Sequence, residues 1–212
     1  MEEEADLGER ARKLFAGPIH FLKSAPELRF LADPTVPEIA FAGRSNVGKS
    51  SLLNALTGRR ALARVSITPG RTRQLNFFEL GGRLALVDMP GYGYAKAGKA
   101  LLADWQGLMF DYLRGRPGLV RVLLLLDARI EIKASDLEVM DLLDRAAVTF
   151  QIVLTKIDAL GPAALARKLE EVGQLARAHP AAHPEVMPTS SETGAGIAEL
   201  RAALAALARS ET

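Results

Sequence analysis

The chain has 212 residues, of which 49% are hydrophobic and 25% are charged, a composition that excludes an intrinsically disordered protein. The formal net charge of +2 permits a nucleic-acid partner without requiring one. The absence of cysteine excludes disulfides and thiolate metal sites and fits a reducing compartment.

Residues 1–37 are predicted to form an N-terminal extension that packs on the domain after it. The start, MEEEADLGERARKLF, is acidic and amphipathic, which predicts a helix at about 5–15 and lacks the features of a signal peptide. Pro26, Pro34 and Pro37 argue against a long element after this helix. Because apolar runs such as VLLLL (122–126) are too short to cross a bilayer, we expect a cytoplasmic protein without a membrane partner.

Residues 38–210 are predicted to form one domain of alternating strands and helices. The predicted strands are EIAFAG (38–43), QLNFFEL (74–80), RLALVD (83–88), VRVLLLLD (120–127), VTFQIVLT (148–155) and EVMPTS (185–190). Gly81-Gly82 predicts an antiparallel hairpin, while the other runs are typical of buried parallel strands. Helices are expected at about 50–58, 100–114, 135–146, 161–179 and 196–208. This order predicts a three-layer α/β/α sandwich with a mostly parallel six-stranded sheet and one antiparallel strand.

The segment GRSNVGKS (43–50) matches the phosphate-binding pattern G-x-x-x-x-G-K-[ST] between a predicted strand and a predicted helix. Gly43 and Gly48 allow a tight turn whose N–H groups face an anion, and the helix dipole adds positive potential. Lys49 is expected to reach the β- and γ-phosphates, and the Ser50 hydroxyl to bind Mg²⁺. The alternative, a chance glycine-rich turn, does not explain this strand–loop–helix context.

The segment ITPGRTRQ (67–74) lies between the phosphate-loop helix and the next strand. A threonine here can bind Mg²⁺ only while a γ-phosphate is present, so the loop is expected to be a switch that is ordered with the nucleoside triphosphate and released with the diphosphate. Thr68 and Thr72 are both candidates.

The segment DMPGYGYA (88–95) follows an apolar strand. Asp88 is expected at the ligand-binding edge of the sheet, where it can hold Mg²⁺ through water rather than merely cap the strand. Gly91 can offer its N–H to the γ-phosphate. Tyr92 stands where many GTPases carry a water-orienting glutamine, so we expect slow intrinsic hydrolysis. We expect Tyr92 and Tyr94 to form a partner surface, with a core role as the alternative.

Two further segments at strand ends predict the base. In TKID (155–158), Asp158 can accept hydrogen bonds from both N1–H and the amine of guanine, a donor pair that adenine lacks. Lys156 can lay its methylene stem along the base. The backbone and hydroxyls of TSSETG (189–194) can contact guanine O6. Together these segments favour GTP over ATP.

The motifs GRSNVGKSSLLNAL, TPGRTRQLNFF, DMPGYGYA, TKID and TSSETG, with FLKSAPE near the start, resemble the EngB family of the TrmE–Era–EngA–EngB–septin class over about residues 20–200. The pairing of DxPGYGYA with TKxD rather than NKxD is specific to that family. The resemblance implies a Ras-like P-loop GTPase fold and a bacterial GTPase that assists assembly of the large ribosomal subunit. It also implies a requirement for the protein in normal cell division and septation.

The resemblance also assigns roles to single residues. It favours Thr72 over Thr68 as the Mg²⁺ threonine. It matches Asn46 to the asparagine that binds K⁺ in related GTPases, the alternative being a hydrogen bond within the loop. Thr155 stands where the wider GTPase pattern has asparagine. Because of this difference we expect this protein to bind nucleotide with only modest affinity.

Basic residues cluster around the predicted switches, either as a solvated face or as a contact surface for ribosomal RNA, which the resemblance favours. They are Arg59, Arg60, Arg64, Arg71 and Arg73, with Lys96, Lys99, Arg114 and Arg116 as an extension. The expected ligands are GTP or GDP with Mg²⁺, and K⁺ is a further candidate. The expected macromolecular partner is the large ribosomal subunit or its precursor. We expect the protein to act as a monomer. The alternatives are a small-molecule kinase, for which we find no acceptor pocket or arginine-rich lid, a module that binds GTP without hydrolysis, and a membrane-associated septation factor.

The predicted nucleotide-binding residues are Gly43, Arg44, Ser45, Asn46, Val47, Gly48, Lys49, Ser50, Ser51, Gly70, Arg71, Thr72, Arg73, Gln74, Asp88, Met89, Pro90, Gly91, Thr155, Lys156, Ile157, Asp158, Thr189, Ser190 and Ser191. Among these, Lys49, Thr72 and Gly91 are the predicted catalytic residues. The predicted Mg²⁺ ligands are Ser50, Thr72 and, through water, Asp88.

Overall fold

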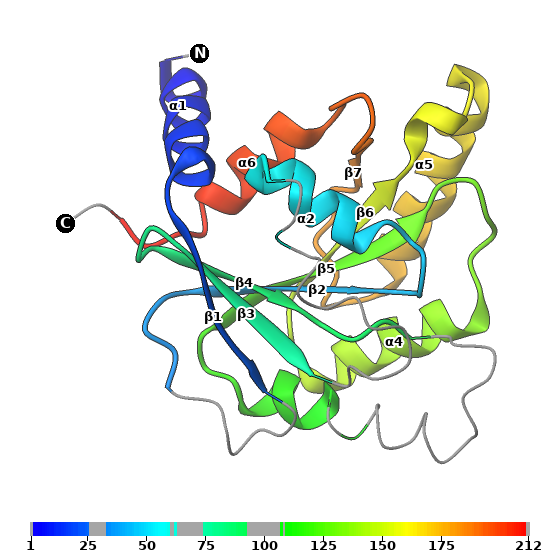
Figure 1. Cartoon of the computed structure of the whole chain (residues 1–212). Helices are drawn as coiled ribbons and strands as arrows, with labels where there is room; N and C mark the ends of the chain where they lie inside the picture. The colour runs from blue at the N-terminus through cyan, green and yellow to red at the C-terminus, as the bar shows by residue number, and fades with distance from the viewer. Residues whose placement is uncertain are drawn as a thin grey trace.

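The computed structural model describes residues 2–25, 33–59, 62, 74–92, 107 and 109–210. Helices lie on both faces of one mixed sheet, which confirms the predicted α/β/α sandwich (Figure 1). The strands are β1 (Ile19–Ala25), β2 (Glu38–Gly43), β3 (Leu75–Leu80), β4 (Leu84–Asp88), β5 (Leu119–Asp127), β6 (Phe150–Thr155) and β7 (Met187–Pro188). The helices are α1 (Glu2–Ala16), α2 (Lys49–Thr57), α4 (Ala134–Ala146), the 3₁₀ turn η3 (Ile157–Ala159), α5 (Pro162–Ala178) and α6 (Ile197–Ala205).

The sheet has seven strands in the order β1-β3-β4-β2-β5-β6-β7, where the sequence predicted six. The additional strand is β1, which pairs antiparallel with β3 at the edge, with Ile19 opposite Leu80. The apolar pattern did not reveal it because an edge strand is only partly covered, and its middle residues are exposed. One strand, β3, runs against all the others, as predicted.

The predicted hairpin between β3 and β4 is confirmed. The two strands pair antiparallel from Asn76–Asp88 to Leu80–Leu84. Gly81 and Gly82 form the turn with φ of +53° and +68°, a left-handed conformation that glycine adopts without steric cost.

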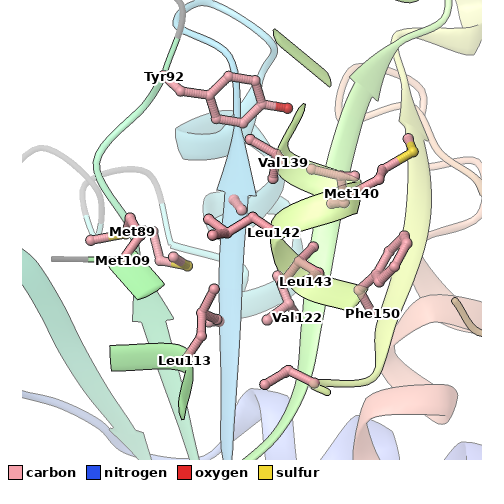
Figure 2. Packing of buried hydrophobic residues seen from close by; sticks show 14 of the residues in the cluster. Met89, Tyr92, Met109, Leu113, Val122, Val139, Met140, Leu142, Leu143 and Phe150 are labelled. Carbon is pink, nitrogen blue, oxygen red and sulfur yellow. The ribbon is translucent and has the colours of Figure 1, made fainter. Parts of the chain in front are cut away.

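The sheet separates two hydrophobic layers because side chains alternate along each strand. On β5, Leu123 and Leu125 face a cluster with α1, α2 and α6, while Val122, Leu124 and Leu126 face a cluster with α4 and α5. Figure 2 shows part of the second cluster, where side chains of α4 such as Leu142 and Leu143 pack beside the sheet. Burial on both faces fixes the central strands and therefore the loops at their carboxyl ends.

The N-terminal segment shares one of these layers. Leu14 and Phe15 of α1 are buried, and α1 lies beside α6 (Figure 1). Arg201 of α6 places its guanidinium 6.0 Å from the centroid of the Phe15 ring and donates hydrogen bonds of 2.8 Å to the carbonyls of Ala55 and Leu56. These bonds serve the free carbonyls at the end of α2, so α1, α2 and α6 form one packed layer.

Within the part of the chain that the structure describes, no helix combines the length and apolar character needed to cross a membrane.

Candidate nucleotide-binding site

The predicted phosphate loop joins β2 to α2. Gly48 precedes the helix with a φ of +104°, and Asn46 also has a positive φ of +66°. A Cβ atom on Gly43 would lie 2.8 Å from Cγ1 of Val47, so a side chain there would crowd the loop, while the positive φ of Gly48 favours glycine at that position. Lys49, Ser50 and Ser51 form the first turn of α2, where the positive end of the helix dipole lies.

Lys49 and Asp88 meet although 39 residues separate them in the chain. Because β4 pairs in parallel with β2, the end of β4 lies beside the phosphate loop, and the Lys49 ammonium donates a hydrogen bond to Asp88 Oδ1. The Asp88 side chain is 4% exposed. Met89 and Pro90 continue from this strand, and Met89 N–H bonds to the Phe41 carbonyl at 3.1 Å. Asp88 therefore lies beside the predicted phosphate loop at the carboxyl end of its strand, and its role toward Mg²⁺ stays a prediction.

Gly91 and Tyr92 extend the parallel pairing onto the phosphate loop. Tyr92 N–H donates to the Gly43 carbonyl at 3.2 Å, and Ser45 N–H donates to the Tyr92 carbonyl at 3.1 Å. A Cβ atom on Gly91 would stand 3.2 Å from Ser45 Oγ, so a side chain at this position would crowd the loop. This segment is thus held directly against the residues predicted to bind phosphate.

The expectation that Tyr92 belongs to a partner surface is wrong. Tyr92 is only 3% exposed, and its hydroxyl donates to Asp136 Oδ1 at 3.0 Å, while its ring points toward α4 near Val139 (Figure 2). Burial, together with the charge of Asp136, raises the pKa of Tyr92 above its usual value. The pairing with Arg44 carries Tyr92 inward, because the backbone still follows the sheet at this point.

The predicted base-reading segments lie at the ends of the next two strands. Thr155 Oγ1 donates to the Val47 carbonyl at 2.6 Å, which ties β6 to the phosphate loop. Lys156 adopts a φ of +61° and donates from Nζ to the Asn46 carbonyl at 2.7 Å. Ile157 and the exposed Asp158 follow in η3.

The segment TSSETG follows β7. Thr189 Oγ1 donates to the Leu154 carbonyl at 2.9 Å, and Ser190 Oγ accepts the N–H groups of Glu192 and Thr193. Both residues are fully buried, so their hydroxyls serve the fold, and Ser191 is more exposed than either. The hydroxyls of Thr189 and Ser190 therefore stabilise this loop. The predicted contact of its backbone with guanine stays a prediction.

Sequence reasoning missed three residues at this edge: Asp127, Arg129 and Asp136. Asp127 ends β5 and pairs with both Arg129 and Lys156, and Asp136 accepts the Tyr92 hydroxyl and the Lys133 N–H. The available signal for Asp127 was the same as for Asp88, a carboxylate directly after an apolar strand.

Arg44 lines a cavity of about 210 Å³ between the phosphate loop and the start of α4, which Asp136 also lines. Its Nε and Nη1 atoms are buried and have no hydrogen-bond partner among the described residues. The Arg44 charge opposes the rise in the pKa of Tyr92.

Part of the predicted basic surface is engaged in the fold. Arg116 donates to both carboxylate oxygens of Glu38, at 2.8 and 2.5 Å, and its side chain is 11% exposed. Its assignment to a solvent-facing basic surface is therefore wrong, because the buried Glu38 requires a charged partner. Arg114 lies 5.4 Å from the Phe110 ring centroid, and Arg59 contacts the Gly17 carbonyl at 3.4 Å.

Several predicted residues lie outside the described part of the chain. They are Arg60, Arg64, Thr68, Gly70, Arg71, Thr72, Arg73, Tyr94, Lys96 and Lys99. Gln74 is described and directly precedes β3.

Comparison with known proteins identifies close relatives. Residues 38–156 match the family described as 50S ribosome-binding GTPase. The chain is 64% identical to the probable GTP-binding protein EngB of Granulibacter bethesdensis, over 97% of this chain and 92% of that protein. It is 63% identical to the protein of the same name from Gluconobacter oxydans, over 94% of this chain and 88% of that one.

Solved structures agree in fold. A crystal structure of a probable GTP-binding protein EngB superposes with a TM-score of 0.62 at 23% identity, covering 77% of this chain and 94% of that one. The structure of Era in complex with MgGDPNP and nucleotides 1506–1542 of 16S ribosomal RNA has a TM-score of 0.62 at 25% identity, covering 84% of this chain and 58% of Era.

Proposed function

Because the chain belongs to the EngB family of P-loop GTPases, we propose that it is a Mg²⁺-dependent GTP switch that acts in the assembly of the large ribosomal subunit. One observation carries the chemical part of this proposal. Lys49, Asp88 and Lys156, from three separate segments, converge on a single phosphate loop at one sheet edge. Such convergence of a lysine, a carboxylate and oriented backbone N–H groups is what binding and hydrolysis of a nucleoside triphosphate require.

In this proposal the central residues of the predicted site have definite roles. The backbone of residues 43–48 and the Lys49 ammonium hold the phosphates, and the Gly91 N–H contacts the γ-phosphate. The exposed Asp158 carboxylate accepts the two donors of guanine. Thr72 and the neighbouring switch residues complete the site from outside the described ranges.

The donor set at this edge fits a hard divalent cation. Ser50 supplies a hydroxyl and Asp88 a carboxylate, both oxygen donors of the kind that Mg²⁺ prefers, with the hydroxyl of Thr72 as the third predicted ligand. Era, a structural neighbour, is described with MgGDPNP. A bound Mg²⁺ would neutralise negative charge on the phosphate oxygens. The Lys49 ammonium, which pairs with Asp88 in this structure, would also neutralise charge on the phosphate oxygens.

We propose that intrinsic hydrolysis is slow, which the position of Tyr92 supports. Its hydroxyl is bound to Asp136, so it is not placed to orient an attacking water as a glutamine would. We propose that K⁺ assists, with the Asn46 side chain as a ligand. Asn46 is exposed, and no hydrogen bond of its side chain is found among the described residues, which supports this role over a bond within the loop.

The proposed site of action is the large ribosomal subunit or its precursor. The family description as ribosome-binding supports it, and Era is described in complex with ribosomal RNA, although that RNA is 16S. The requirement for normal cell division and septation would then follow from faulty ribosome assembly. A cytoplasmic monomer that works without a membrane completes the proposal.

Phosphate release from GTP by the purified protein tests the chemistry. We expect measurable single-turnover hydrolysis that depends on Mg²⁺ and is faster in K⁺ than in Na⁺ at equal ionic strength. Lys49→Ala should reduce nucleotide binding to near background, because the phosphates lose their principal cation. Equal rates in K⁺ and Na⁺ would remove K⁺ from the account, and unchanged GTP affinity of Lys49→Ala would refute the phosphate-loop assignment.

A further inference from the structure

Asp127 is a buried carboxylate at the nucleotide-binding edge that belongs to none of the sequence motifs. It ends β5 directly opposite Thr155 of β6, and its side chain is only 5% exposed. Parallel strands bring their carboxyl ends to one edge, so Asp127 lies between the phosphate loop and the TKID segment.

Four donors hold the Asp127 carboxylate. Arg129 donates from its backbone N at 3.1 Å, from Nε at 2.9 Å and from Nη2 at 2.8 Å, and Lys156 donates from Nζ at 2.8 Å. Burial opposes ionisation of Asp127, but the hydrogen bonds from Arg129 and Lys156 outweigh it and lower the pKa of Asp127. The group is therefore a charged anchor at neutral pH.

Lys156 is fixed at two points by this arrangement. Its ammonium bonds both to Asp127 and to the Asn46 carbonyl of the phosphate loop. Its stem crosses the loop, because a Cβ atom on Gly48 would lie 3.4 Å from Lys156 Cε. The left-handed backbone of Lys156 directs the side chain toward the loop at the start of η3.

We propose that Asp127 is a positioning residue for guanine nucleotide binding, acting through Lys156. A free lysine side chain loses much rotamer entropy when a ligand fixes it, and Asp127 fixes it beforehand. The methylene stem is then ready to underlie the base, and the Asn46 carbonyl is held in place. This inference rests on the proposed role of Lys156 beneath guanine.

The expected effect is equal for both nucleotides. Because the stem contacts the base and not the γ-phosphate, Asp127→Asn should weaken GDP and GTP binding by the same factor, about tenfold. Asparagine has almost the same shape, so the fold is kept while the charge is lost. Asp127→Glu, which keeps the charge but displaces it by one methylene, is the second variant and should show a smaller loss.

A double-mutant cycle separates positioning from a general structural role. Lys156→Met keeps the stem and removes the ammonium. In that background Asp127→Asn should change GDP affinity by less than about twofold, because the partner through which it acts is gone. If Asp127 had only a structural role, Asp127→Asn would lower GDP affinity by the same factor with and without Lys156→Met.

Glu38→Gln is the matched control. Glu38 is also buried and paired bidentately with an arginine, but it stands at the opposite end of the strands, where β2 begins. Its substitution should lower stability and leave GDP affinity unchanged.

The measurement is GDP and GTP affinity by titration calorimetry on the full chain, with circular dichroism to confirm folding. A folded Asp127→Asn protein that binds GDP within twofold of the original chain would overturn the inference while leaving the proposed function intact. Equal losses with and without Lys156→Met would also overturn it. Failure of the unaltered chain to bind GDP would instead refute the nucleotide site itself.

Discussion

At the scale of single residues, Tyr92 connects the phosphate loop to α4. Its backbone bonds to Gly43 and Ser45, and its hydroxyl reaches Asp136, which also accepts the Lys133 N–H at the start of α4. Any movement of the Tyr92 side chain must therefore break a buried hydrogen bond to a carboxylate. Such bonds stabilise more than neutral ones do, since the acceptor is charged.

Tyr92→Phe tests this contact. The variant leaves Asp136 Oδ1 buried without its donor, so we expect the free energy of unfolding to fall by about 1–3 kcal/mol. Tyr112→Phe is the control, because Tyr112 is equally buried and donates to Glu38, which keeps two bonds from Arg116. Urea unfolding should show a smaller loss for Tyr112→Phe, and equal losses would contradict a special role for the Tyr92 bond.

Asp158→Asn tests the choice of base. The amide would place a donor against the donors of guanine, and it suits xanthine, which carries a carbonyl where guanine carries the amine. Loss of a hydrogen bond to a charged group predicts a fall in GTP affinity of roughly 10- to 100-fold, with a gain for XTP. Competition binding with both nucleotides measures the change, and retained discrimination for GTP would count against this role of Asp158.

The residues of the site that sequence could predict are those whose function depends on local spacing. The glycines and lysine of the phosphate loop, and Asp88 and Asp158 after apolar strands, are recognisable because strand, turn and helix follow one another in the chain. Tyr92–Asp136 and Glu38–Arg116 could not be predicted in this way. Their partners are 44 and 78 residues apart, and only the folded sheet brings them together.

At the scale of elements, the central strands and the hairpin could be predicted from the sequence, but the outermost strand β1 could not. Burial on both faces gives β2, β5 and β6 continuous apolar runs, and Gly81-Gly82 marks the turn between β3 and β4. The outermost strand β1 is covered on only part of its surface, and its partner β3 lies far from it in the sequence. Its existence therefore depends on tertiary contacts that no local pattern encodes.

The helix α1 offers an element-scale prediction. Phe15 is 2% exposed and packs in the layer with α2 and α6, so Phe15→Ala should lower the free energy of unfolding by about 3–5 kcal/mol. Urea denaturation measures this loss. Phe21→Ala is the control, because Phe21 is 44% exposed and should cost much less. A loss below about 1 kcal/mol for Phe15→Ala would contradict the packing of α1 as part of the fold.

At the scale of the whole molecule, the fold collects the ends of β2, β4, β5 and β6 at one edge, where the phosphate loop, Asp88, Asp127 and Lys156 meet. The opposite ends of these strands carry structural pairs such as Glu38–Arg116. The proposed nucleotide-binding ends of the strands are thus separate from the structural pairs at their other ends. This division of the sheet is the physical basis for proposing a switch.

Co-sedimentation with large ribosomal subunits tests the central claim most directly. The full chain would be mixed with the subunits in the presence of a non-hydrolysable GTP analogue or of GDP, at several salt concentrations. We predict binding with the GTP analogue and not with GDP, weakening steeply as salt rises because phosphate contacts release counterions. Absence of binding in both nucleotide states, or equal binding in both, would contradict a GTP-controlled switch on the ribosome.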